Sequence, residues 1–164
     1  MKWAALIAWV ITALGGFGLL GIWLRSGGLA AASRPGARIR PPLIFSHMAL
    51  AATGLVLWII YLAADKDAIA WAAVIVLGPV AILGFSMLAI WIQQRTHQPI
   101  SAGASGVAAT APPAGASGST VAVSGRGDRP PEQHFPIPVV VLHGLLAVTT
   151  LTLAILASAG VGGS

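Results

Sequence analysis

Two histidines lie inside long apolar stretches, and they are the residues of this sequence best suited to chemistry. His47 lies in PPLIFSHMALAATGLVLWIIYLAA, residues 41–64, and His143 lies in FPIPVVVLHGLLAVTTLTLAILAS, residues 135–158. Ionisable side chains within membrane segments are costly and are therefore candidates for function. Two imidazoles on different helices can bind one haem iron from opposite sides, or they can hydrogen-bond neighbouring helices. The helices that carry the histidines decide whether the two rings can share a site.

The composition is that of a membrane protein. Hydrophobic residues make up 57% of the 164 residues and charged residues only 8%, whereas a typical soluble domain has roughly a quarter charged residues. A helix needs about 20 mostly apolar residues to cross a bilayer. Residues 3–24, 43–63, 68–92 and 138–157 meet this condition. We therefore expect an all-α membrane protein with four transmembrane helices.

The four apolar segments are related to one another in two pairs. Residues 3–24 align with residues 71–92 without gaps, and ten of the 22 positions are identical. The pattern P-x4-H-x2-L-A-x-T recurs at an offset of 96 residues and aligns His47 with His143. We interpret the chain as a duplicated two-helix hairpin, with parallel copies related by a pseudo-twofold axis along the membrane normal. The copies are residues 1–66 and residues 67–164.

The basic residues predict the orientation in the plasma (inner) membrane. Lys2 and Lys66 lie on one side of the predicted spans. The arginines on the other side are Arg25, Arg34, Arg38, Arg40, Arg95, Arg126 and Arg129. Because cytoplasmic loops are enriched in Lys and Arg, we expect loops 25–42 and 93–137 in the cytoplasm and both termini outside. Residues 94–135 form a low-complexity loop rich in Ala, Gly, Ser and Pro, which we expect to be largely disordered.

The depth of the two histidines is compatible with a shared site. His47 is the fifth residue of its predicted span and His143 the sixth, so each lies one to two turns inside the cytoplasmic boundary. If their faces meet at the pseudo-twofold axis, His47 and His143 can be the axial ligands of a b-type haem. Arg38 and Arg40 can then bind the haem propionates through charge-assisted hydrogen bonds.

Two other interpretations use the same residues. The simplest is structural, because a histidine can bridge two membrane helices by a hydrogen bond worth roughly 1 kcal/mol. The other is proton or substrate handling. His97 and His134, in the long loop, show no tight metal-ligand spacing and are expected to be solvated.

Several function classes are disfavoured. The chain has no cysteine, which excludes disulfides and thiolate metal sites. No span contains paired carboxylates, and no phosphate-binding glycine loop, G-x-S-x-G or H-E-x-x-H motif occurs. The isoelectric point near 11.3 does not indicate nucleic acid, because the basic residues flank spans, where membrane topology explains them. The sequence favours a protein without enzymatic activity.

The segments FSHMALAATGLVLWIIYLA and HFPIPVVVLHGLLAVTTLTL resemble the small four-span integral membrane proteins of high-GC Gram-positive bacteria. This resemblance implies a location and an architecture, but no reaction and no site residues. A second similarity, to bis-histidine cytochrome b membrane anchors, is based on His47 and His143 alone and implies haem binding.

Three functions are compatible with these features. The first is a multi-pass accessory or structural protein that acts in the lipid bilayer by binding a partner protein or a second copy of itself. The second is a b-type haem protein for electron transfer, with His47 and His143 as ligands. The third is a small transporter.

Overall fold

The computed structural model describes residues 1–31, 39–96 and 131–161, and every regular element in these ranges is helical. The long helices are α1 (Lys2–Arg25), α3 (Pro41–Ala64), α4 (Asp67–Thr96) and α5 (Ile137–Ser158). All four are long and apolar enough to cross a membrane. The short elements are α2 (Gly28–Ala31) and the 3-10 helix η1 (Pro131–His134). The all-α prediction and the four expected helices are therefore confirmed.

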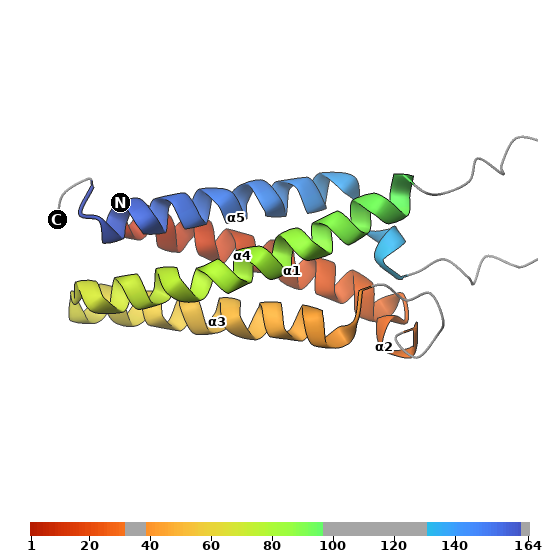
Figure 1. Ribbon diagram of the computed structural model, residues 1–164, viewed down its shortest axis with the longest axis horizontal. Helices are drawn as coiled ribbons and strands as arrows, with labels where there is room; N and C mark the ends of the chain where they lie inside the picture. Colours follow the sequence, from red (N-terminus) through yellow and green to blue (C-terminus); the bar gives the residue numbers. More distant parts are fainter. Residues whose placement is uncertain (32–38, 97–130, 162–164) are drawn as a thin grey trace, which may run out of the picture.

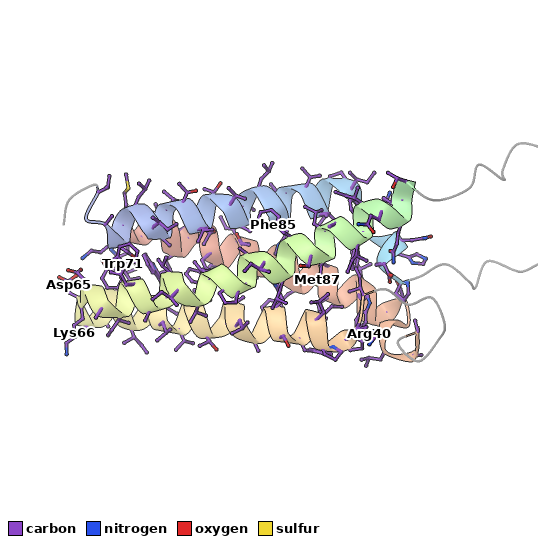
Figure 2. All side chains as sticks on the ribbon, in the orientation of Figure 1. Arg40, Asp65, Lys66, Trp71, Phe85 and Met87 are labelled. Carbon is purple, nitrogen blue, oxygen red and sulfur yellow. The ribbon has the colours of Figure 1, made fainter. Side chains whose placement is uncertain are left out.

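The four long helices run side by side in an elongated bundle (Figure 1). Both termini and the α3–α4 turn lie at one end of the bundle, whereas α2 and η1 lie at the other. We call these the termini end and the arginine end, because Arg25, Arg40 and Arg95 lie near the second. Figure 2 shows Asp65 and Lys66 at the first end and Arg40 at the second.

Helix pairing is most extensive between α1 and α5 and between α3 and α4. Smaller contacts join α4 to α5 and α1 to α3. In Figure 1, α4 starts alongside α3 at the termini end and reaches α5 at the arginine end. The bundle therefore consists of two closely packed helix pairs that contact each other less extensively.

The observed helices contain the predicted spans and extend beyond them. The helix α4 ends at Thr96, and η1 orders residues 131–134. Within the low-complexity loop of residues 94–135, residues 94–96 and 131–134 are therefore helical. The remainder of it, residues 97–130, lies outside the described part of the chain.

A tightly packed core occupies the termini end. The rings of Trp9 and Trp58 are 6.2 Å apart, and those of Trp58 and Tyr61 are 5.1 Å apart in an edge-to-face arrangement. The Trp58 indole Nε1 donates a hydrogen bond of 3.2 Å to the carbonyl oxygen of Lys2. Alanines let the helix backbones approach these rings. The fully buried ones are Ala5, Ala70, Ala73 and Ala154.

A second buried cluster closes the arginine end, where η1 packs on α1, α2 and α4. Gln94 Nε2 donates a hydrogen bond of 2.7 Å to the buried carboxylate of Glu132. Trp91 Nε1 donates to the carbonyl oxygen of Glu132, and Arg95 donates to that of Phe135. The guanidinium of Arg95 also lies over the Trp91 ring, 4.5 Å from its centroid. These contacts hold residues 132–135, which precede α5, against the last turns of α4.

Candidate functional site

The two histidines occupy the same register in their helices. His47 is the seventh residue of α3, and His143 is the seventh residue of α5. At a rise of 1.5 Å per residue, each lies about 9 Å along its helix from the arginine end. Both side chains are half-buried. The equal depth expected from the repeated pattern is therefore present, although the helices begin slightly earlier than predicted.

Each imidazole makes one hydrogen bond to the backbone of a neighbouring helix. His47 Nδ1 lies 3.0 Å from the carbonyl oxygen of Val80 on α4. His143 Nδ1 lies 3.0 Å from the carbonyl oxygen of Thr12 on α1. A carbonyl oxygen only accepts, so Nδ1 carries the proton in both rings. In the neutral imidazole, this tautomer leaves the Nε2 lone pair available as an acceptor or a metal ligand.

A glycine lies beneath each ring. A Cβ atom at Gly84 would lie 3.2 Å from Cε1 of His47, and one at Gly16 would lie 3.1 Å from Cε1 of His143. These distances are tighter than nine in ten real Cβ contacts. Glycine is therefore what allows each ring to lie close to the facing helix and reach its carbonyl oxygen. We call each arrangement of histidine, carbonyl and glycine a histidine seat.

The two histidine seats use residues of α1 and α4 that are separated by the same number of positions in the sequence. Val80 follows Thr12 by 68 residues, and Gly84 follows Gly16 by the same number. This is the offset of the ungapped alignment between residues 3–24 and 71–92. The α1/α5 seat also has a hydroxyl contact of 3.2 Å between Thr12 and Thr150. The corresponding positions in the α3/α4 seat are Val80 and Gly54, which have no hydroxyl, so the seats differ in this respect.

The histidines lie in a part of the bundle where no residue is fully buried. We define the open section as residues 10–22, 41–53, 81–90 and 137–149, between the two buried clusters. None of these residues is buried. The small side chains of Ala13, Ala51 and Ala81 are half-buried here, and Ala51 packs against the core at the termini end. Membrane helix bundles associate by close packing, and the open section is the stretch of the four long helices that contains no buried residue.

The other predicted site residues are not part of the histidine seats. Arg40 is the exposed N-cap residue of α3, where the chain is extended before Pro41 and Pro42. Arg38 and His97 lie outside the described residues. His134 is exposed on η1. In the described ranges, no group of three or more His, Cys, Asp or Glu residues is arranged to hold a metal ion.

Two polar clusters were not predicted from the sequence. At the termini end, Lys2 forms an ion pair with Asp65, and its ammonium group lies 5.2 Å from the centroid of the Tyr61 ring. At the arginine end, Glu132 is buried against Gln94. Glu132 lies beside the low-complexity segment, where no ordered contact was expected. Neither cluster has a local signature, because its partners are 38 to 63 residues apart in the sequence.

Comparison with known proteins identified no matching family model, no similar curated protein and no similar solved structure.

Proposed function

We propose that this chain is an accessory protein of the plasma membrane that acts by binding, and that its open section receives the bound partner between the helices. One observation carries the proposal: four neighbouring helix segments have no buried residue, although buried clusters lie on both sides of them. Protein interiors are otherwise close-packed. A bound partner would supply the contacts that this section lacks.

The hydroxyl groups of the open section support binding rather than catalysis. The hydroxyls of Thr53, Ser86 and Thr149 each donate to the carbonyl oxygen four residues earlier in the same helix. General acid–base catalysis requires groups that can exchange a proton with a substrate, and these hydroxyl protons are already donated within the protein.

The duplicated hairpin is the architecture that we propose for this binding protein. The equivalent histidine seats support it, as do matching exposures at aligned positions. Phe17 and Phe85 are 59% and 58% exposed, whereas Ala5 and Ala73 are both fully buried. Under this interpretation, α1 corresponds to α4 and α3 to α5, so the open section is lined twice by the same set of positions.

We further propose that the arginine end faces the cytoplasm. At the termini end, Lys2 and Lys66 are balanced by Asp65 and Asp67, so the excess positive charge lies at the other end. Single cysteines introduced at Ser117 and Ser164 should report this orientation, because the chain has no native cysteine. An impermeant thiol reagent should label Ser164→Cys in intact cells and leave Ser117→Cys unlabelled. The opposite labelling pattern would reverse the orientation.

Photo-crosslinking tests whether the open section is occupied. A diazirine amino acid at Met48, which is half-buried in the open section, should yield a discrete non-lipid adduct in native membranes. The same probe at Phe85 is a matched control, because Phe85 lies in the same section but is 58% exposed. The probe at Phe85 should yield only lipid adducts, which mass spectrometry identifies. Lipid adducts alone at both positions would overturn the proposal.

A further inference from the structure

We propose that the arginine end binds the headgroups of anionic phospholipids through the exposed guanidinium groups of Arg25 and Arg40. This inference concerns one end of the bundle and does not depend on what occupies the open section. It is supported by the distribution of charge, by the hydrogen bonds of the guanidinium groups and by the apolar side chains beside them.

The exposed charge of the arginine end is positive. At the termini end the two lysines are balanced by two aspartates, so the formal net charge of +5 comes from the other side of the spans. Within the described part of the chain, Glu132 is the one acidic residue at the arginine end. It is 1% exposed and accepts a hydrogen bond from Gln94. A ligand that approaches this end of the described bundle therefore meets exposed guanidinium groups and no exposed carboxylate.

Two of the three described arginines at this end have donors to spare. Arg95 is used within the protein, because it donates to backbone carbonyl oxygens before α5 and lies over the ring of Trp91. Arg25 donates through Nε alone, to the carbonyl oxygen of Gly21 at 3.3 Å. Arg40 caps α3 without a side-chain hydrogen bond to that helix. The terminal nitrogens of Arg25 and Arg40 therefore have no acceptor among the described residues.

Exposed apolar side chains lie close to both arginines in the chain. Leu24, directly before Arg25, is 42% exposed, and Leu29 of the short helix α2 is 56% exposed. Phe45, five residues after Arg40, is 38% exposed. At the end of a membrane bundle such side chains lie against acyl chains, while long basic side chains extend to the headgroups. The apolar residues therefore favour a lipid over a soluble anion, which would contact the guanidinium groups alone.

An anionic headgroup supplies the acceptors and the charge that this surface lacks. A planar guanidinium binds a phosphate group through two parallel charge-assisted hydrogen bonds. Each basic side chain near an anionic membrane surface also strengthens binding by about fivefold, and salt screens this attraction. We therefore expect the protein to prefer anionic over zwitterionic phospholipids, and we expect the preference to weaken as the ionic strength rises.

Native mass spectrometry measures this preference. The wild-type protein, reconstituted in bilayers of equal parts phosphatidylglycerol and phosphatidylcholine, should retain more phosphatidylglycerol than phosphatidylcholine on release. Arg25→Gln and Arg40→Gln should each lower this ratio by about fivefold. Lys66→Gln is the matched control, because Lys66 is an exposed cation at the termini end that lies between two aspartates, and it should leave the ratio unchanged. Arg25→Lys and Arg40→Lys should retain most of the preference, which separates loss of charge from loss of folding.

Three results would overturn this assignment. The first is an equal retention of the two lipids by the wild type. The second is an unchanged ratio in the Arg25→Gln/Arg40→Gln double variant with intact helical circular dichroism. The third is release of the retained phosphatidylglycerol by millimolar inorganic phosphate, which would indicate a site for soluble anions. None of these results affects the proposed function, because the Met48 probe reports on the open section alone.

Discussion

Replacing Trp58 with alanine is expected to lower the free energy of unfolding by about 3–5 kcal/mol, the usual cost of removing a large buried aromatic side chain. Trp58 is fully buried between Trp9 and Tyr61. The substitution would also remove the hydrogen bond to the carbonyl oxygen of Lys2, which joins α3 to α1. Reversible unfolding in mixed detergent micelles, followed by circular dichroism, measures the change.

Trp71→Ala is the matched control for this substitution, because Trp71 is 44% exposed and belongs to α4. Its loss should change the free energy of unfolding by no more than about 0.5 kcal/mol, as is usual for surface positions. Equal effects of the two substitutions would contradict the location of the core at the termini end.

Gly54→Ala is expected to cost about 1–3 kcal/mol, because it places a methyl group in a packed core. The new Cβ would lie 2.9 Å from Cζ2 of Trp9, a ring that is itself held against Trp58. The change should appear as a lower midpoint of detergent-induced unfolding.

Gly18→Ala separates this packing effect from helix propensity. Gly18 lies within α1, and a Cβ there has no neighbouring atom within 4 Å, while alanine favours a helix over glycine by about 1 kcal/mol. The variant should be as stable as the wild type or more stable. A Gly54→Ala protein that behaves like Gly18→Ala would show that Trp9 does not pack against α3.

The four long helices could be predicted because membrane helices are specified by uninterrupted apolar length, which each segment contains in its own sequence. The equal depth of His47 and His143 could be predicted for the same reason, since each is placed by its distance from a proline near the helix start. Helix ends were less predictable. The polar residues Gln93 and Gln94 ended the apolar run but not α4, because both are good helix formers.

The partners of the histidines could not be predicted. Each ring donates to a backbone carbonyl oxygen, of Val80 or of Thr12, and such an acceptor has no side-chain signature. One signal was nevertheless present. Gly16 aligns with Gly84 in the comparison of residues 3–24 with 71–92, and these are the two glycines beneath the rings. A glycine retained in both segments marks a close approach of another group.

The lack of buried residues in the open section could also not be predicted from the sequence. A run of Leu, Ala and Gly is compatible with either a closed or an open helix interface, and only the arrangement of all four helices distinguishes them. At the termini end, the large rings of Trp9, Trp58 and Tyr61 fill the space between the helices. At the level of the histidines, the residues beside the rings are Gly16 and Gly84. The difference in side-chain size explains why one region is closed and the other is not.

The central claim is that the open section receives a bound partner between the helices. Native mass spectrometry of the protein, released from membranes in mild detergent, tests it most directly. We predict a species heavier than the bare chain by a discrete non-lipid mass. If the protein shows only bare and lipid-bound masses, the claim is contradicted.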